Sequence, residues 1–421
     1  MDNLTDAHWF PLTSQGNIYS MTKLCSAIGS DKILVASLKR KIYSCEYNRT
    51  PKYRHLRPLV KELLFTYIPN GAEIISIDAY NKSEKGDEFV IGITIMKTSN
   101  DATVERYLNI YTEGEGDGEC DENSTIETVA QNCLMVELSY TPYHLYHTTM
   151  PSGRHSVREV VWLLSGSDYN IHMIREDEGS HDYAESSLEK HFPELENLEA
   201  IATWIDIYYY NNQTRRVTAV GCECGLVKVS LVDVENINII KNWTLRYDKP
   251  VSSVRIFCNE NVVPKPKFLG GDETDTDERH EEPALNILVV NTVHASVVFM
   301  DILYNDMEKD VKLAGSDSSD CVLCSCIADI NMDGKNEILL GTYNQEILVY
   351  TLVDDAWEFK ERRLFDAPVH SMAYLDLTGD GMKELAVLTQ RGVHVLQHDP
   401  GEVEKTVMQR FRKYLALRSL T

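Results

Sequence analysis

Residues Ile327–Leu352 read IADINMDGKNEILLGTYNQEILVYTL, an acidic turn followed by two apolar runs. Residues Asp376–Gln397 read DLTGDGMKELAVLTQRGVHVLQ and repeat the same features in the same order. Each segment begins with an Asp-x-x-x-Asp-Gly turn and a glutamate, and continues with an apolar strand, a short turn and a second strand. Self-similarity along a chain is the sequence signature of repeat folds. The two segments therefore predict adjacent units of a repeat.

Looser copies of this two-strand unit lie upstream. They start at Lys32, Glu88, Glu159, Val217 and Asn286. Val, Ile, Tyr and Thr are frequent in them, as expected for strands on a pleated, partly buried surface. Further β-rich segments bring each unit to about four strands, the size of a propeller blade. Because such a blade buries its faces only against its neighbours, the pattern predicts an all-β, seven-bladed β-propeller over residues 15–400, with six or eight blades as alternatives.

Two acidic segments interrupt the repeats. Residues 113–127 read EGEGDGECDENSTIE, and residues 259–283 read NENVVPKPKFLGGDETDTDERHEEP. Their low apolar content and their Gly and Pro residues predict acidic, mobile loop insertions. Residues 175–200 are also acidic, with some helical character near their end. For all three segments we favour a solvated insertion, and the alternative is a docking peptide for a partner.

The C-terminal residues 402–418 differ from the rest of the chain. Apolar residues recur there at helical spacing, namely Val403, Val407, Phe411, Tyr414 and Leu415. The second half of the segment is basic, with no acidic residue after Glu404. We expect a C-terminal amphipathic helix. The favoured interpretation is a helix that packs against the last blade, and the alternative is a helix offered to a partner or a membrane surface.

Charge and composition exclude several classes of protein. The 421-residue chain has a formal net charge of −24, which argues against nucleic-acid binding and disfavours anionic lipid, because both ligands require basic surfaces. No apolar run reaches the ~18 residues of a membrane-spanning helix. The N-terminal sequence MDNLTDAHWFPLTSQ lacks the basic start and apolar stretch of a secretory signal, so we expect a cytoplasmic protein with reduced cysteines.

The two acidic turns offer oxygen donors to a cation. The donors are Asp329, Asn331, Asp333 and Glu337 in the first turn, and Asp376, Thr378, Asp380 and Glu384 in the second. Calcium takes about six to eight oxygen ligands, and a tight turn can bring several short carboxylates together. The turns resemble the calcium turns of FG-GAP repeats in integrin α-subunit propellers, although glutamate replaces aspartate at the ninth position. The resemblance implies a structural calcium ion in each turn.

The alternative is a metal-free turn in which side-chain oxygens accept backbone N–H groups. An EF-hand is excluded, because its twelfth position requires a bidentate glutamate and here holds Leu340 or Val387. No cofactor is required on either interpretation. The cysteines lack paired zinc spacing, and nucleophile-elbow, P-loop and dinucleotide motifs are absent from the sequence. We predict no catalytic residues and no enzyme; a site in the propeller channel, built from residues far apart in sequence, is the alternative.

Longer matches extend over most of the chain. The sequences AQNCLMVELSYTPYHLYH from Ala130, VWLLSGSDYNIHMIRE from Val161 and DSSDCVLCSCIADINMDG from Asp317 resemble the kaptin family. The resemblance runs from about Gln15 to His398. It implies a non-catalytic scaffold subunit of the KICSTOR complex. That complex tethers GATOR, a complex that stimulates GTP hydrolysis by the Rag GTPases, to lysosomes. It thereby restrains TOR complex 1 when amino acids or glucose are scarce.

The resemblance also implies partners and a location. The expected partners are a second FG-GAP propeller subunit of KICSTOR in a heterodimer, the other KICSTOR subunits and the GATOR complex. The expected location is the cytoplasm, with recruitment to the lysosomal membrane surface. The alternative function is an actin-filament-associated protein of the cytoskeleton. Because actin is acidic, this alternative requires a basic contact, for which Lys405 to Arg418 are the candidates.

Overall fold

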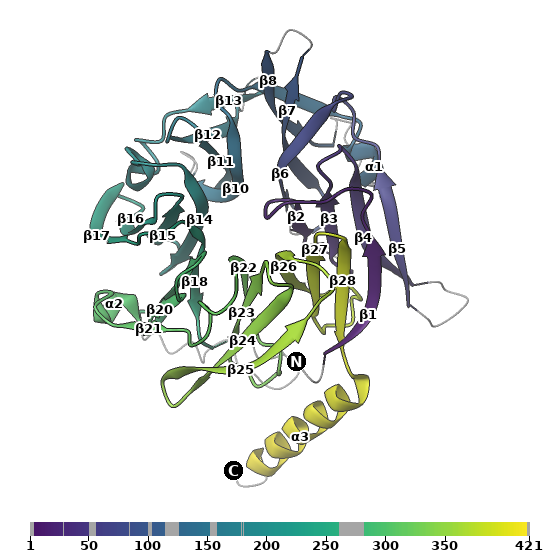
Figure 1. Ribbon diagram of the computed structural model, residues 1–421, viewed down its shortest axis with the longest axis vertical. Helices are drawn as coiled ribbons and strands as arrows, with labels where there is room; N and C mark the ends of the chain where they lie inside the picture. The colour runs from purple at the N-terminus through teal and green to yellow at the C-terminus, as the bar shows by residue number, and fades with distance from the viewer. Residues whose placement is uncertain are drawn as a thin grey trace.

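Seven four-stranded antiparallel sheets surround a central axis in the computed structural model (Figure 1). The structure describes residues 4–27, 29–49, 56–83, 85–99, 103–113, 126–151, 158–177, 179, 181–260 and 282–418. The innermost strand of each sheet contacts that of the next, and the last contacts the first, so the ring is closed. These strands are β2 (Met21–Leu24), β6 (Ala72–Asn81), β10 (Pro142–Pro151), β14 (Ala202–Tyr210), β18 (Val251–Cys258), β22 (Val322–Ala328) and β26 (Val369–Leu375). The predicted seven-bladed β-propeller is confirmed.

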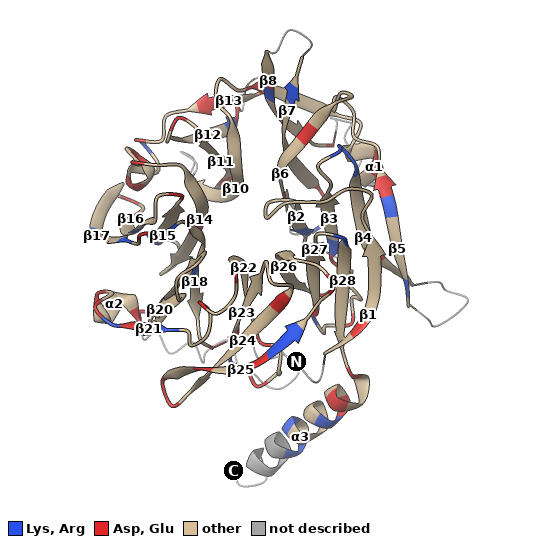
Figure 2. Cartoon of the chain, viewed as in Figure 1, with Lys and Arg blue, Asp and Glu red and all other residues tan. Residues whose placement is uncertain are grey.

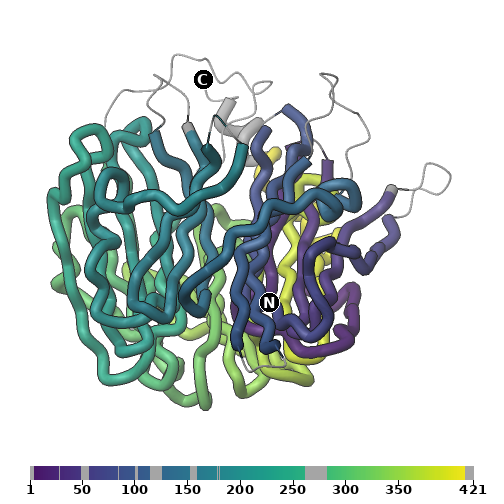
Figure 3. The backbone as a smooth tube through the Cα atoms, turned by 90° about the horizontal axis from the view of Figure 1, so that it is seen from above, coloured from purple at the N-terminus to yellow at the C-terminus, as the bar shows by residue number. Residues whose placement is uncertain are grey.

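In blades 1 to 6 the other three strands follow outward in chain order. They are β3 (Lys32–Ala36), β4 (Ile42–Arg49) and β5 (Leu56–Leu63); β7 (Phe89–Thr98), β8 (Val104–Tyr111) and β9 (Cys133–Glu137); β11 (Arg158–Gly166), β12 (Ile171–Glu176) and β13 (Tyr183–Ser186); β15 (Arg215–Cys222), β16 (Leu226–Asp233) and β17 (Asn238–Arg246); β19 (Leu285–Asn291), β20 (Val297–Phe299) and β21 (Asp310–Lys312); and β23 (Glu337–Thr342), β24 (Glu346–Val353) and β25 (Ala356–Leu364). The two-strand units recognised in the sequence are the middle pair of each sheet. In the side view the strands run along the ring axis (Figure 3).

The last blade combines both ends of the chain. It contains β26, β27 (Glu384–Thr389), β28 (Gly392–His398) and, as its outer strand, β1 (Leu4–Pro11) from the N-terminus. Strand β1 pairs antiparallel with β28, from Leu4 opposite His398 to Pro11 opposite Gly392. The propeller therefore starts at residue 4, upstream of the predicted boundary at residue 15. Pairing of the two termini closes the ring with hydrogen bonds and covers the edge that β28 would otherwise expose.

The second strand from the axis is apolar along most of its length in most blades, because both of its faces are buried. In β3, Ile33 and Val35 pack against blade 7, whereas Leu34 and Ala36 pack against blade 2. Successive side chains of a strand point to opposite faces, so a strand between two neighbours needs an unbroken apolar run. Among the described residues, one hydrophobic cluster fills each of the seven spaces between neighbouring blades. These clusters hold the blades at fixed positions around the axis.

Residues 175–200 do not form a solvated insertion, and that prediction was wrong for the part that the structure describes. The segment contains the end of β12, all of β13 and a short 3-10 helix, η1 (Pro193–Leu195). Phe192 and Leu195 are fully buried between blades 3 and 4. The acidic composition of the segment gave no indication that it also contains buried apolar residues.

The two predicted loop insertions lie almost wholly outside the described residues. Of residues 113–127, the structure describes Glu113 and the pair Ile126–Glu127, which begins the short helix α1 (Ile126–Val129). Of residues 259–283, it describes the first two and the last two. Both segments connect strands within one blade, the first between β8 and β9 and the second between β18 and β19. The mobility of these insertions stays a prediction.

Helix α3 (Pro400–Arg418) projects from the ring after β28 (Figure 1). The Asp399 carboxylate accepts the backbone N–H groups of Gly401 and Glu402 and so caps its first turn. Val407 and Phe411 are 54% and 50% exposed. A helix is present where we expected one, but the favoured packing against the last blade was wrong for the residues described, because β1 covers the flank of β28. Within the described residues no helix is long and apolar enough to span a bilayer.

Candidate functional site

The first acidic turn connects β22 to β23 and brings its predicted donors together. Both carboxylate oxygens of Asp329 accept backbone N–H groups, Oδ1 from Asp333 at 3.0 Å and Oδ2 from Gly334 at 2.9 Å. The side-chain amide of Asn331 donates to Asp333 Oδ2 at 3.2 Å and to the carboxylate of Glu337. The four predicted donors therefore converge, but their oxygens are bonded to N–H groups of the turn itself.

The second acidic turn, between β26 and β27, has the same geometry. The Asp376 carboxylate accepts the backbone N–H of Asp380 at 3.2 Å and that of Gly381 at 2.8 Å. The hydroxyl of Thr378 donates to Glu384 Oε1 at 3.2 Å. Its four predicted donors also lie in one turn. Equivalent bonds in both turns indicate that the repeated sequence encodes one local structure.

A buried glutamate accepts a backbone hydrogen bond from each turn. Glu337 and Glu384 are 2% and 4% exposed, and each is the first residue of the strand that follows its turn. The Glu337 carboxylate accepts the backbone N–H of Ile330 at 2.9 Å, and that of Glu384 accepts the N–H of Leu377 at 2.8 Å. Desolvation by burial raises the pKa of both carboxyls to about 7, with the neighbouring aspartates adding to the effect. Each glutamate therefore stabilises its turn from inside the sheet.

The bonding of the first turn determines how it could hold a cation. The Asn331 amide nitrogen lies between the carboxylates of Asp333 and Glu337. An N–H group cannot be a metal ligand, so calcium would fit only if Asn331 turned its amide oxygen inward. Among the described residues, no group of three or more His, Cys, Asp or Glu side chains is arranged to hold a metal. Calcium binding and the metal-free turn therefore both stay predictions.

Both turns also connect neighbouring blades. The Tyr374 hydroxyl of blade 7 donates to the carbonyl of Asp329 in blade 6 at 3.0 Å. The backbone N–H of Asp31 in blade 1 donates to the carbonyl of Asp376 at 2.8 Å, and the N–H of Asp376 donates back to Asp31 Oδ2 at 3.2 Å. The first turn thus connects blade 6 to blade 7, and the second connects blade 7 to blade 1, where the ring closes.

Polar side chains on the inner strands join further blades, and sequence reasoning missed them. Asp78 of β6 accepts the backbone N–H of His147 in β10 at 2.8 Å, and its Oδ2 lies 2.7 Å from the His147 Nδ1. Asp206 of β14 accepts the N–H of Ile256 in β18 at 2.7 Å. A charged residue inside an apolar strand was the only sequence signal for these contacts.

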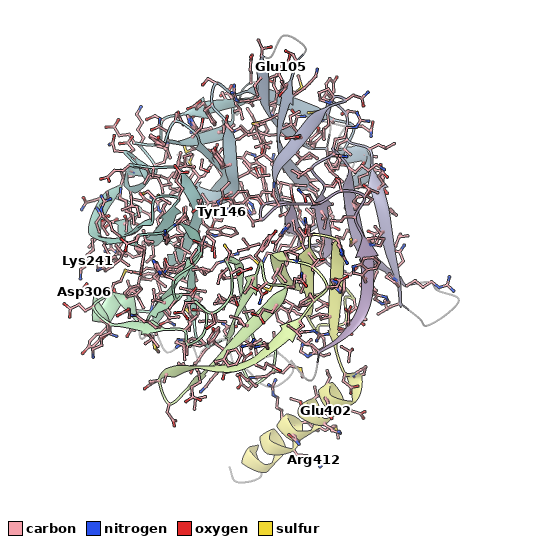
Figure 4. The ribbon with its side chains drawn as sticks, in the orientation of Figure 1. Glu105, Tyr146, Lys241, Asp306, Glu402 and Arg412 are labelled. Carbon is pink, nitrogen blue, oxygen red and sulfur yellow. The ribbon has the colours of Figure 1, made fainter. Side chains whose placement is uncertain are left out.

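The third blade uses neutral groups for the same purpose. Tyr146, which faces the inside of the ring in Figure 4, accepts the backbone N–H of Ile207 at 3.2 Å. His144 Nδ1 accepts the N–H of Ile205 at 3.2 Å, and its ring stacks on Trp204 with centroids 4.5 Å apart. Burial lowers the pKa of His144 to about 3, so its imidazole stays neutral and can accept this bond. Asp78, Asp206, Tyr146 and His144 of the inner strands therefore each bond to a neighbouring blade.

The cysteines form no zinc site among the described residues. Cys324 and Cys326 are buried on β22, and Cys222 is buried on β15 of another blade. Desolvation raises the pKa of Cys222 and of Cys324 to about 12, which keeps both as neutral thiols. They behave as small apolar residues of the core.

Comparisons with known proteins agree with this fold. A family model described as KICSTOR complex protein kaptin matches residues 4–408. A protein of Mus musculus, KICSTOR complex protein kaptin, is 37% identical over 405 residues, which cover 95% of this chain and 89% of the mouse chain. The chain belongs to the kaptin family. A solved structure of the Dos1 propeller has a TM-score of 0.51 at 8% identity, covers 94% of this chain and 95% of the Dos1 chain, and shows the fold alone.

The family match includes β1 and ends inside α3. In this kaptin-family chain the ring and its closing strand therefore lie within the matched residues 4–408, together with both acidic turns. Figure 2 shows Asp and Glu on many loops of the ring, whereas α3 carries Lys and Arg beyond its first turn. The chain offers surfaces of opposite charge on one molecule.

Proposed function

We propose that this kaptin-family chain is a non-catalytic scaffold subunit of the KICSTOR complex. The observation that carries the proposal is the family match, which extends over residues 4–408 and hence over the whole ring. A closed propeller with apolar spaces between its blades suits a rigid platform. The inner polar groups support the same view, because those described above bond to neighbouring blades.

The proposal includes the partners and location that the family resemblance implies. The chain pairs with a second FG-GAP propeller subunit, joins the remaining KICSTOR subunits and helps to tether GATOR at the cytoplasmic surface of lysosomes. Through GATOR it restrains TOR complex 1 when amino acids or glucose are scarce. The acidic surface supports protein partners over nucleic acid, because the net charge of −24 repels phosphate.

Co-expression with the other KICSTOR subunits tests this function. A tagged chain is purified with those subunits and passed through size-exclusion chromatography. We expect one stable peak that contains the chain and its partners in fixed ratio. Elution of the folded chain as a separate monomer, with no partner in its peak, would contradict the proposal.

Binding to actin filaments is the second candidate function. It is favoured by the exposed basic side chains of α3, including Arg410 and Arg412, which could meet the acidic surface of actin. Cosedimentation with filaments separates the two functions. A chain shortened by residues 400–421 should lose cosedimentation if this candidate is correct, and unchanged cosedimentation would remove α3 as the contact.

A further inference from the structure

Helix α3 presents an apolar stripe that nothing covers in the described part of the chain. Val407, Met408 and Phe411 are 54%, 45% and 50% exposed. With about 3.6 residues per turn, the three side chains fall within roughly 100° of the helix circumference. Apolar stripes of this kind normally pack against another element. We name these three side chains the α3 stripe.

Basic residues flank the α3 stripe on both sides. On the helical wheel, Arg410 lies about 60° before Val407, and Arg412 lies about 40° beyond Met408. Both arginines are exposed, and Arg412 lies near the outer end of the helix in Figure 4. An apolar centre with a cation on each rim is complementary to an apolar groove with carboxylates on each rim. The residues of α3 therefore predict a partner surface that is apolar at its centre and acidic at its edges.

Three other surfaces could bind the α3 stripe, but each would bind it less favourably than an acidic protein groove. The ring of the same chain is acidic, yet α3 projects away from it, since β1 occupies the neighbouring flank. A second copy would bring Arg410 and Arg412 close to the same residues of its partner, and like charges disfavour that contact. An anionic membrane would have to approach a chain with a net charge of −24. Most helical stability in proteins comes from packing of an apolar face, which favours a protein partner for the stripe.

We propose that α3 is a docking helix whose stripe binds a hydrophobic groove, rimmed by Asp or Glu, on another subunit of the KICSTOR complex. The inference rests on the proposed function and adds the segment through which the chain is held. Helix-in-groove binding relies on a few apolar anchors at helical spacing. Phe411 is the largest anchor of the stripe, and the arginines fix its orientation in the groove.

The test compares two variants of the full-length chain, each co-expressed with the other KICSTOR subunits. V407A/M408A/F411A removes the stripe and keeps a good helix former at each position. T406A/Q409A makes similar changes between these positions and is the matched control. We expect the stripe variant to lower the affinity of the chain for its partners by about tenfold or more, as loss of a central aromatic anchor does. The control should bind like the original chain.

A charge variant tests the carboxylate rims. R410E/R412E should weaken the same interaction, and raising the salt concentration should weaken binding of the original chain more than that of R410E/R412E. Partners that bind the original chain and the stripe variant equally well would overturn the docking helix while leaving the proposed function intact. Failure of the original chain to bind any KICSTOR subunit would instead remove the proposed function.

Three further measurements test whether the α3 stripe binds a membrane, a second copy of the chain or actin filaments. Flotation with vesicles of phosphatidylcholine and phosphatidylserine tests a membrane, light scattering tests a second copy, and cosedimentation tests actin filaments. We expect the stripe variant to match the original chain in all three. A stripe-dependent signal in any of them would overturn the assignment of the groove to a KICSTOR subunit.

Discussion

Arg216 and Glu194 form an ion pair in which each residue is only 1% exposed. Arg216 Nε and Nη2 donate to the two carboxylate oxygens at 2.9 and 3.0 Å. The Thr218 hydroxyl donates to Glu194 Oε1 at 2.7 Å, and the guanidinium lies 4.3 Å from the centroid of the Phe192 ring. The pair fastens the segment that leads into blade 4 to β15 of that blade.

Removal of one partner from this pair should strongly destabilise the ring. Glu194→Ala leaves the Arg216 charge buried without a carboxylate, and we expect the free energy of unfolding to fall by about 3–5 kcal/mol. Urea denaturation measures the change. The matched control is Glu199→Ala, which breaks the exposed pair of Glu199 with Arg246 and should leave the free energy of unfolding almost unchanged. Equal losses in both variants would show that burial of the first pair has no energetic role.

The closing strand gives a second prediction. Deletion of residues 1–11 removes β1 and leaves β28 as an unpaired edge. We expect Tm to fall by about 10 °C or more, or the chain to associate through the open edge. Deletion of residues 400–421 is the control and should leave Tm within about 2 °C, because α3 projects from the ring. A shorter N-terminus with unchanged Tm would mean that closure does not depend on β1.

The blades could be predicted from the sequence because each is encoded by turns and strands within a short stretch of the chain. The turns at Asp329 and Asp376 repeat with the same spacing to Glu337 and Glu384, and the structure gives them equivalent hydrogen bonds. Unbroken apolar runs such as Ile33 to Ala36 identify strands whose two faces are buried. Periodicity and turn chemistry therefore sufficed for the fold and for the position of the candidate turns.

Features that depend on distant contacts escaped prediction. Strand β1 mixes exposed polar and apolar residues and resembles no repeat, so nothing local indicates that it pairs with β28. The buried pair of Glu194 and Arg216 is invisible in an acidic segment, since composition does not show which carboxylate meets a cation. The spacing of Val407 and Phe411 predicts a stripe correctly but cannot say which chain covers it.

His144 should make stability depend on pH. Its pKa is lowered from 6.5 to about 3 by burial, so between these values the unfolded chain binds the proton that the folded chain excludes. The contribution of neutral His144 is therefore present above about pH 6.5 and is lost as the pH falls. We expect His144→Gln to show a flatter decline of Tm between pH 7 and about pH 5 than the original chain.

The control for this experiment is His294→Gln, which changes an exposed histidine in a loop. It should keep the original dependence of Tm on pH. A decline that is equally steep in His144→Gln would mean that other groups cause the acid sensitivity.

The acidic turns should be stable without calcium. Asp329→Ala removes two backbone hydrogen bonds of its turn and Asp376→Ala removes three, and we expect a loss of about 1–2 kcal/mol in each, as for other side-chain caps. The loss should be the same in chelator and in calcium. Thermal unfolding of the original chain should likewise shift by less than about 1 °C on addition of calcium. A rise of several degrees that disappears in Asp329→Ala would establish calcium as a structural ligand.

If this chain acts as a KICSTOR scaffold, its loss should remove the restraint on TOR complex 1 during amino-acid shortage. The most direct measurement is the phosphorylation of TOR complex 1 substrates after amino-acid withdrawal, in cells that lack the chain. We predict that phosphorylation persists in those cells and falls again when the original chain is restored. A normal fall in cells without the chain, with the other KICSTOR subunits present, would show that the chain has no part in this restraint.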